Sequence, residues 1–371
     1  MQLTQASRQW ANRPNDERFT SLHDLFDRVS RQRSLSRAPI VSTRDIVVRP
    51  DPEDKASGLQ VVRLRKPGEG PVHPYSPTNW AFNQLSKLAS APSAYLKSLP
   101  APMAADCINY GIHHAREVEN VGLLLTKDGD VQELRAACGP NYGRIWNEEV
   151  VRTLIDMHGD GVTGRFRVPG EFGKAVKVTK ANTTIFGSDR DIFVFLADET
   201  NRVEVKNRRG GQPGSLARGF FTWNSEVGNS SIGVAFFFFD HACQNRIVWG
   251  AENFREIRIN HTASAPWRWL EEITPMLTDY ADAAAAPMEQ MIRRAQAKKA
   301  DDNLDRFLAS RFTTGMVATI KATHEREEGR PIETLWDAVT AVTAQARSIE
   351  HQDSRVAMER IGGKILDLVA A

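Results

Sequence analysis

Cysteine is scarce in this chain. Three cysteines, Cys107, Cys138 and Cys243, stand far apart among 371 residues. An odd and widely spaced set argues against a disulfide framework and fits a reducing compartment. No apolar run approaches the roughly 18 residues that a membrane span needs, and the polar start MQLTQASRQW lacks the apolar segment of a secretory signal. We therefore expect a cytoplasmic protein with no membrane partner.

The signatures of the common enzyme families are also missing. The sequence contains no G-x-S-x-G, H-E-x-x-H or G-x-G-x-x-G motif and no set of protein-kinase motifs. Its acidic pairs, such as Asp198 with Glu199, are adjacent rather than facing each other, which is typical of a solvated surface. The sequence therefore predicts no cofactor and identifies no catalytic residue.

What the sequence does contain is a clear pattern of strands and helices. The segments IFVFLA at 192–197 and VAFFFF at 234–239 are apolar at every position, which predicts strands covered on both faces. The span 120–145 predicts a hairpin whose turn is Asp128 and Gly129, and NEEVVRTLIDMH after it predicts a helix. Apolar residues recur at helical spacing over 22–29 and again after Pro266, so we expect helices at both ends of the chain.

The fold class that follows is α+β, with a central, mainly antiparallel mixed sheet, N-terminal helices and a helical C-terminal region. A chain of this length exceeds the size at which a single core usually keeps growing. We expect an N-terminal segment of helices and loops over 1–110 that packs on the core. A central sheet domain over 111–265 and a C-terminal helical region over 266–371 should follow.

Positive charge is concentrated in the middle of the chain. Between Arg165 and Arg218 there are eleven Lys or Arg residues against six Asp or Glu, although the net charge of the whole chain is only +2. Basic and apolar residues alternate in RFRV and NRVEVKNR, which is the period of a half-buried strand. A basic strand face can hold a phosphate backbone by releasing counterions, and Phe221 and Trp223 nearby would stack on bases. The predicted nucleic-acid-binding residues are Arg165, Arg167, Lys177, Arg202, Lys206, Arg208, Arg209, Arg218 and Trp223.

Other interpretations stay open for the basic strands and for the stretch DHACQN. The basic strands can form a solvated face that keeps the protein soluble, with the aromatic residues in the core. The stretch DHACQN, in turn, places His241 and Cys243 two residues apart on a strand, with His261 later, as in a zinc-dependent hydrolase or nuclease. Structural zinc sites normally present two close pairs, and the second pair is missing, so no metal site is predicted.

Several segments carry a family resemblance. The chain contains RPNDERFTSL, NYGRIWN, FGSDRDIFVFLADE, WNSEVGNSSIGVAFFFFDHACQN with the later INHT, and TLWDAVTAVTAQAR with MERIGGKIL. Together they resemble the phage/plasmid-like protein family of unknown function (domain of unknown function 932). The resemblance places the family's Cys-x-Asn on Cys243 and Asn245, its later His on His261 and its closing-helix aromatic on Trp336. The candidate family motif is His241, Cys243, Asn245 and His261. Thr340 departs from the Asn-Ala-Val-Thr that often closes the family, so no role of that Asn carries over.

The resemblance also implies a setting. Members look like accessory proteins of mobile elements, found with replication and recombination functions, and they have a distant similarity to single-strand annealing proteins. Together with the basic segment, this predicts a non-catalytic phage or plasmid protein that binds or anneals single-stranded DNA as a homo-oligomer. The alternatives are a metal-dependent enzyme at His241, Cys243 and His261, and a structural protein that self-associates through its C-terminal helices.

Overall fold

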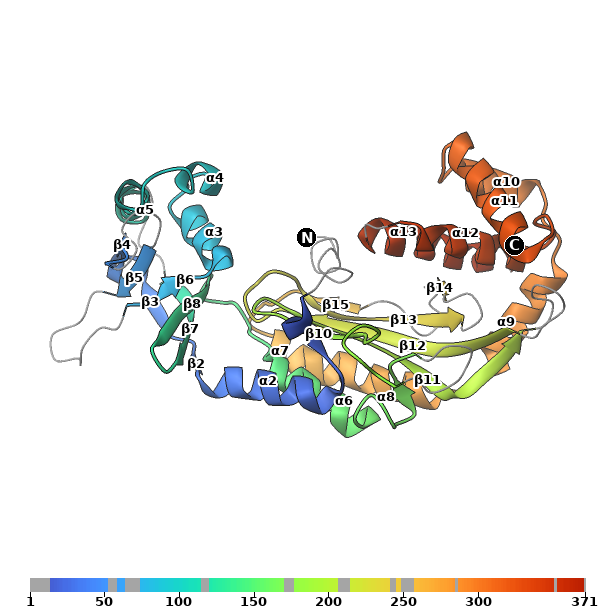
Figure 1. Cartoon of the computed structure of the whole chain (residues 1–371), viewed down its shortest axis with the longest axis horizontal. Helices are drawn as coiled ribbons and strands as arrows, with labels where there is room; N and C mark the ends of the chain where they lie inside the picture. Colours follow the sequence, from blue (N-terminus) through green and yellow to red (C-terminus); the bar gives the residue numbers. More distant parts are fainter. Residues whose placement is uncertain are drawn as a thin grey trace.

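The computed structural model (Figure 1) describes residues 14–52, 59–63, 74–114, 120–169, 177–205, 214–240, 245–247, 257–283, 286–349 and 352–369. Its helices are α2 (Leu22–Ser34), α3 (Asn79–Leu88), α4 (Ser93–Leu96), α5 (Ala101–His114), α6 (Asn147–His158), α7 (Ala265–Arg268), α8 (Thr274–Asp282), α9 (Ala286–Ala297), α10 (Asp302–Ala309), α11 (Thr314–Glu328), α12 (Leu335–Arg347) and α13 (Gln352–Lys364). Short 3-10 turns are η1 (Asn15–Glu17), η2 (Thr43–Asp45) and η5 (Ile365–Val369), and the π-helical turn η4 (Trp269–Ile273) joins α7 to α8.

The strands form three sheets. The largest has the order β1 (Arg18–Phe19), β10 (Ile185–Gly187), β11 (Ile192–Val205), β12 (Gly214–Asn224), β13 (Ile232–Asp240) and β14 (Asn245–Ile247), with β9 (Phe166–Arg167) on β11 and β15 (Ile257–Ile259) on β13. The second contains β2 (Ser36–Arg37), β3 (Ile40–Ser42), β6 (Ser76–Pro77), β7 (Asn120–Asp128) and β8 (Val131–Cys138), and the third pairs β4 (Ile46–Pro50) with β5 (Leu59–Arg63). The pairing is antiparallel except between β6 and β8, so the predicted α+β class with mixed, mainly antiparallel sheets is confirmed.

The predicted apolar strands lie at the centre of the largest sheet. Residues 192–197 in β11 and 234–238 in β13 are buried at every position, and β12 runs between the two strands. Successive side chains alternate between two apolar layers, because neighbouring residues of a strand point to opposite faces. Phe236 packs with Tyr280 of α8, whereas Phe237 packs edge-on against Phe195 in the opposite layer. Both faces of these strands are therefore core.

Glycine allows large rings to lie flat across this sheet. A Cβ on Gly219 would be 2.4 Å from Cζ of Phe237, and a Cβ on Gly233 would be 2.2 Å from Cζ2 of Trp223. Each glycine is paired with the residue whose ring covers it, since Gly219 pairs with Phe237 and Gly233 with Trp223. Any larger residue at these two positions would displace the ring.

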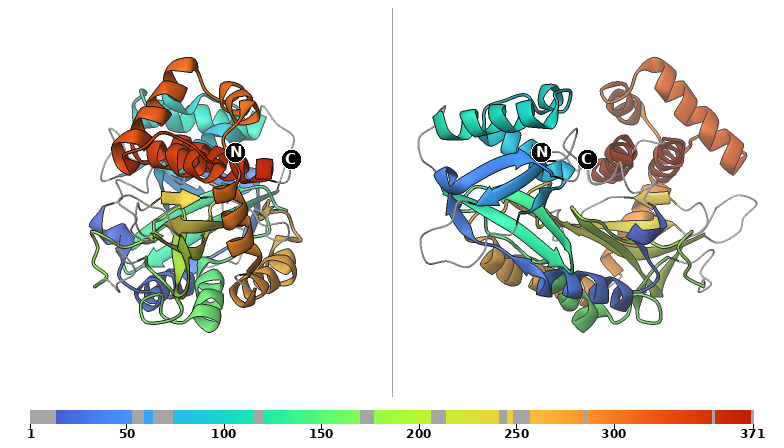
Figure 2. Two further views of the ribbon diagram at one scale, coloured as in Figure 1. Left: turned by 90° about the vertical axis from the view of Figure 1, so that its right-hand side faces the viewer. Right: turned by 60° about the vertical axis from the view of Figure 1, so that its left-hand side comes forward.

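Helices cover the two sides of the largest sheet. In Figure 1 and in the end-on view of Figure 2, α2, α6, α7 and α8 lie below it and α12 and α13 lie above it. The lower core joins residues such as Leu25, Leu154 and Trp269 to Phe220 and Phe236. The C-terminal helices form a second core on the far end of β11 to β13, and it includes the closing-helix aromatic Trp336.

The second and third sheets form an N-terminal lobe together with α3, α4 and α5. Figure 1 places this lobe at one end of an elongated molecule and the C-terminal helices at the other, with the largest sheet between them. The predicted hairpin is β7–β8, and its turn residues are Gly129 and Asp130, one position later than expected, with Gly129 at φ +61°. The predicted helix NEEVVRTLIDMH is α6 with the expected bounds.

Candidate functional site

The basic residues predicted to line a strand surface are largely paired with buried acids. Asp198 of β11 is fully buried, and its Oδ2 accepts a hydrogen bond from Nε of Arg165 at 2.9 Å. Arg218 of β12 is only 5% exposed, 3.6 Å from the same oxygen, and donates to the carbonyl oxygens of Tyr280 and Ala283. Arg165 also donates to the carbonyl oxygen of Ala281, so both arginines connect the sheet to the end of α8.

The carboxylate in this cluster is strongly stabilised. Burial alone would raise the pKa of Asp198, but hydrogen bonds from Asn201, Thr200 and Arg165 outweigh it and lower the pKa below its usual value. A carboxylate with this many donors stays ionised and neutralises the guanidinium groups beside it. The expectation that Arg218 faces solvent for a polyanion is therefore wrong, whereas Arg165, whose side chain is 35% exposed, reaches solvent but is paired with a carboxylate.

The remaining members of the predicted surface differ in their surroundings. Arg202 pairs with the buried carboxylate of Glu199, and Trp223 is 1% exposed inside the core, so it has no free face for a base. Arg167 is half-buried and Lys177 is exposed. Lys206, Arg208 and Arg209 lie outside the described residues. The stacking role expected for Trp223 and Phe221 is likewise excluded by their burial.

Most of the candidate family motif falls outside the part of the chain that the structure describes. His241 and Cys243 lie outside the described residues, as does the side chain of Asn245, whose backbone pairs with Asp240 at the end of β13. His261 follows β15, which pairs with the start of β13 at Ile232. Eight residues of strand, about 26 Å, separate Ile232 from Asp240, so β15, which precedes His261, lies at the opposite end of β13 from Asp240. Within the described part of the chain, no three His, Cys, Asp or Glu side chains are grouped to hold a metal.

Three of the segments that carry the family resemblance do meet, where the N-terminal lobe joins the largest sheet at β8. The turn after β12 lies against β8, the segment between β8 and α6, and the turn between β10 and β11. At the centre, Nη1 of Arg135 is 3.1 Å from Oε2 of Glu226, and both side chains are 2% exposed. Arg135 also donates to the carbonyl oxygen of Asp189, and Oε1 of Glu226 accepts from the backbone N–H of Asn147. We call this cluster the lobe junction.

Neutral polar groups complete the lobe junction. Asn224 donates to the side-chain oxygen of Asn147 and to the carbonyl oxygen of Ile145, both at 2.8 Å, and is fully buried. The hydroxyl of Ser225 donates to the carbonyl oxygen of Arg190 at 2.7 Å. Buried polar groups are costly unless they are paired, so these contacts fix the turn after β12 in one conformation.

The N-terminal lobe holds the next residue of the same turn. The carbonyl oxygen of Val227 accepts hydrogen bonds from Nε1 of Trp80 and Nε2 of Gln84 on α3, both at 2.8 Å. The thiol of Cys138 lies 3.6 Å from the same oxygen, and burial raises its pKa, so it stays a neutral thiol. The lobe junction therefore ties α3 and β8 to the largest sheet.

A column of alternating cations and aromatic rings runs along the edge of the lobe junction. Cζ of Arg33, in the last turn of α2, lies 3.7 Å from the ring centroid of Trp146. Cζ of Arg144 lies 5.7 Å from the same ring and 5.2 Å from that of Tyr142, which stacks on His261 at 4.8 Å. All five side chains are half-buried, so each keeps some contact with solvent. We call Arg33, Trp146, Arg144, Tyr142 and His261 the stacked column.

The charges of the stacked column come from its arginines alone. Burial lowers the pKa of His261 to about 4, so its ring is neutral near pH 7 and Nδ1 donates to the carbonyl oxygen of Gly143. Burial also raises the pKa of the Tyr142 hydroxyl, which donates to the carbonyl oxygen of Ser225. Burial lowers the pKa of Arg144, but a guanidinium remains charged in proteins. The column therefore presents two fixed cations and three neutral rings.

An exposed tryptophan directly follows a segment that packs against the stacked column. Gly143 packs so closely on the start of α7 that a Cβ there would be 1.9 Å from the carbonyl oxygen of Thr262 and 3.0 Å from Cδ of Pro266. Trp267 follows directly and is 63% exposed, with Leu270 one turn later at 58%. Tryptophan is highly buried on average, so the exposed pair of Trp267 and Leu270 is a candidate contact surface.

The sequence did not predict that the segments of the lobe junction lie together. NYGRIWN supplies Tyr142, Arg144 and Trp146, and WNSEVGN supplies Glu226, yet the two lie about eighty residues apart. The available signal was that both segments place charged residues among aromatic ones. Nothing in their spacing indicates that Arg144 donates to the carbonyl oxygen of Glu226.

The fold and the lobe junction define an α+β protein whose N-terminal lobe is locked to a long antiparallel sheet by buried polar contacts. A family pattern described as "Domain of unknown function (DUF932)" matches residues 173–362 of the chain. The chain belongs to this family, as the resemblance indicated. The match includes Glu226 and His261, whereas Arg135 and the rest of the stacked column lie before it.

No curated protein and no solved structure matches the chain. None of the described helices combines the length and the apolar character required to cross a lipid bilayer.

Proposed function

We propose that this protein binds single-stranded nucleic acid at the stacked column and at Trp267. The supporting observation is the alternation of guanidinium groups and aromatic rings along one half-buried edge, together with the exposed indole of Trp267 at the start of α7. Proteins that hold single strands combine cations that follow the backbone with aromatic rings on which bases stack. The proposed role is the non-catalytic one that the resemblance implies, in recombination or replication of a phage or plasmid.

The geometry of Arg33 is suited to a phosphate. Its Cζ lies over the ring of Trp146 at 3.7 Å, and no hydrogen bond engages its guanidinium among the described residues, although its charge also acts on the carboxylate of Glu149. A guanidinium held by its face keeps its N–H donors, which lie in the plane of the group, for an oxyanion. Trp146 therefore orders this cation in advance, which reduces the entropy lost on binding.

The geometry of Trp267 is suited to a base. Its ring is mostly in solvent, whereas the aromatic residues of the sheet are enclosed in the core. A base in duplex DNA is already stacked between its neighbours, so a protruding indole favours bases that are free of a duplex. We therefore expect preference for single strands over duplex of the same length.

The first test removes the stacking surface. Fluorescence anisotropy with a labelled oligo(dT) should show Trp267→Ala weakening binding by roughly 5- to 150-fold, which corresponds to about 1 to 3 kcal/mol for one stacked base. Leu270→Ala is the matched control, because it shortens a similarly exposed side chain on the next turn without removing an aromatic ring. Equal losses in the two variants, or no binding by the unmodified chain at low salt, would refute the proposal.

The second test removes one cation. Arg33→Gln should reduce the slope of log K against log salt by about 0.7, the value for one phosphate contact with a single strand. Arg28→Gln makes the same change on an exposed position of the same helix, five residues away, and should leave the slope unchanged. A slope that falls equally in both variants would point to nonspecific charge rather than to the stacked column.

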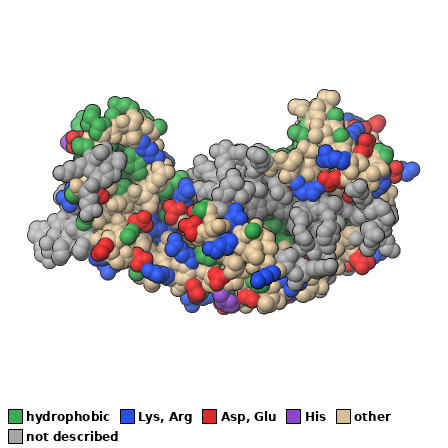
Figure 3. Space-filling model, viewed as in Figure 1, with side chains coloured by type: hydrophobic (Ala, Val, Ile, Leu, Met, Phe, Trp, Pro, Cys, Tyr) green, Lys and Arg blue, Asp and Glu red, His purple; other side chains and the backbone are tan. Residues whose placement is uncertain are grey.

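An apolar stripe on α5 favours self-association as a second function. Met103 and Tyr110 are 54% and 67% exposed and lie seven residues apart on one side of the helix, with the exposed Cys107 between them. Figure 3 shows hydrophobic side chains gathered over this outer tip of the N-terminal lobe. If two copies meet through α5, mild oxidation should link them through Cys107, and Cys107→Ser should abolish the link. A chain that elutes as a monomer at high concentration would exclude this function.

A further inference from the structure

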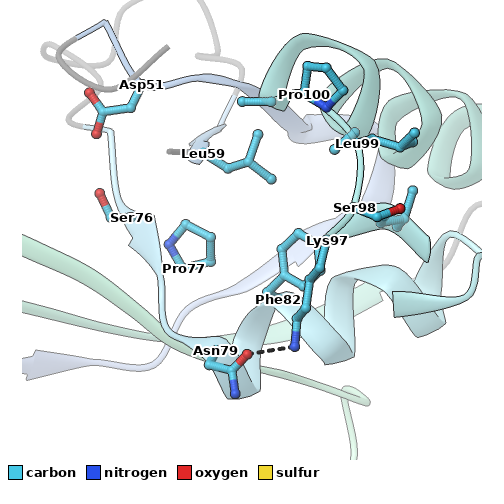
Figure 4. Close-up of a pocket in the computed structure, with 13 residues that line it drawn as sticks. Asp51, Leu59, Ser76, Pro77, Asn79, Phe82, Lys97, Ser98, Leu99 and Pro100 are labelled. Carbon is cyan, nitrogen blue, oxygen red and sulfur yellow. Dashed lines mark hydrogen bonds between the residues drawn. The ribbon is translucent and has the colours of Figure 1, made fainter. Parts of the chain in front are cut away.

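The N-terminal lobe contains a cavity that lies apart from the stacked column. Its volume is about 790 Å³, within the range of small-molecule sites. Figure 4 shows its lining residues arranged around an open centre, with Leu59 of β5 pointing into it. The lining comes from the ends of β4 and β5, from β6, and from α3, α4 and the start of α5: Asp51, Leu59, Ser76, Pro77, Asn79, Phe82, Leu96, Lys97, Ser98, Leu99, Pro100, Ala101 and Ala104.

The walls of the cavity are mainly aliphatic. Leucine, proline and alanine side chains make up most of the lining, and Phe82 is its single aromatic residue. The ammonium group of Lys97 lies over that ring, 5.5 Å from its centroid. The face of Phe82 is therefore already occupied by a cation, so the cavity fits an aliphatic body better than a planar base.

One wall carries a cation with unused donors. Nζ of Lys97 donates to Oδ1 of Asn79 at 2.6 Å, which holds the ammonium at the rim. An ammonium has three N–H donors, and no second acceptor engages this one among the described residues. Asp51, the acid of the lining, stands on the opposite side of the opening and has its own interaction within the chain. A ligand with one negative group would therefore bind with that group at Lys97.

We propose that this cavity binds an amphipathic anion, with an aliphatic chain against Leu59, Leu96 and Leu99 and a carboxylate at Lys97. This function goes beyond nucleic-acid binding and does not depend on it. Phe82 and Asn79 face the cavity, whereas Trp80 and Gln84 of the same helix contact the lobe junction. The cavity and the lobe junction thus lie on different sides of α3.

The test uses the full chain and two ligands with the same tail and opposite charge. Isothermal titration calorimetry should show decanoate binding to one site and decyltrimethylammonium binding at least about tenfold more weakly, as expected when a charge-assisted contact is lost. Lys97→Met removes the charge and keeps an apolar side chain of similar length, so it should weaken decanoate binding about tenfold as well. Lys87→Met is the matched control, because Lys87 is an exposed lysine on α3 that does not line the cavity.

Three results would overturn the assignment. Decanoate binding as tightly to Lys97→Met as to the unmodified chain would remove the carboxylate contact. Equal affinity for the two decyl ligands would show that the cavity does not select anions. Deoxyadenosine monophosphate displacing decanoate would show a nucleotide site instead of an aliphatic one. Oligo(dT) binding, measured on the same Lys97→Met sample, should be unchanged, so failure here is distinguishable from failure of the nucleic-acid proposal.

Discussion

Removing one partner of the buried ion pair in the lobe junction should strongly destabilise the fold. Glu226→Leu leaves the guanidinium of Arg135, which is 2% exposed, without its carboxylate. A buried charge that loses its partner costs about 3 to 5 kcal/mol. The same change removes the acceptor of the Asn147 N–H, which adds about 1 to 3 kcal/mol for an unsatisfied buried donor. The sum is comparable to the whole stability of many proteins.

Replacing both partners should cost much less than the sum of the single changes. Arg135→Met with Glu226→Leu leaves no unpaired charge, and well-packed apolar residues can replace a buried ion pair at little cost. The Asn147 N–H still lacks its acceptor, so about 1 to 3 kcal/mol of destabilisation should remain. The predicted coupling energy is therefore at least about 2 kcal/mol.

Urea denaturation followed by circular dichroism measures all four members of this cycle. Midpoints should fall sharply for each single variant and recover in part for the double variant. Additivity within about 0.5 kcal/mol would refute the argument, because it would mean that Arg135 and Glu226 do not compensate each other in the folded state. Thr126→Ala, a change on the neighbouring strand β7 outside the lobe junction, controls for general effects on the N-terminal lobe.

Two further predictions concern the core. Phe237→Ala should destabilise the chain by about 3 to 5 kcal/mol, because its ring is fully buried against Phe195; a change below about 1 kcal/mol in urea midpoints would contradict that burial. Burial lowers the pKa of His158 from 6.5 to about 4, so the unfolded chain binds a proton that the folded chain does not, and stability should fall as the pH drops through this window. His158→Leu should remove up to about 3 kcal/mol of that loss, and an unchanged pH profile would refute the assignment.

Much of the fold was predictable because it depends on local patterns. A strand that is apolar at every position is stable mainly in the middle of a sheet that is covered on both faces. Residues 192–197 and 234–238 lie there. The β7–β8 hairpin and α6 followed from a turn signal and from helical periodicity. The second sheet was less accessible, since its strands are short and come from distant parts of the chain.

The prediction of a basic strand surface failed because alternating basic and apolar residues identify one face of a strand. They do not identify the residues with which the basic side chains pair. The carboxylate that pairs with Arg165 comes 33 residues later, in β11, and no local pattern connects the two. The pairing of β11 with β12 also shifts between Ala197 and Arg202. A bulge changes which residues point to which face of the sheet. The alternation of side chains between the two faces over 192–197 therefore does not predict which face Arg202 is on.

The lobe junction and the stacked column depend on each other. Arg144 belongs to both, because its guanidinium donates to the carbonyl oxygen of Glu226 and lies over Trp146 and Tyr142. The ion pair with Arg135 fixes the turn that contains Glu226. The carbonyl oxygen of Glu226 then fixes Arg144, the middle cation of the stacked column. A change at Glu226 should therefore loosen the column without touching a bound strand. The buried polar contacts thus do more than connect two lobes, since they set the position of the cation on which the proposed binding depends.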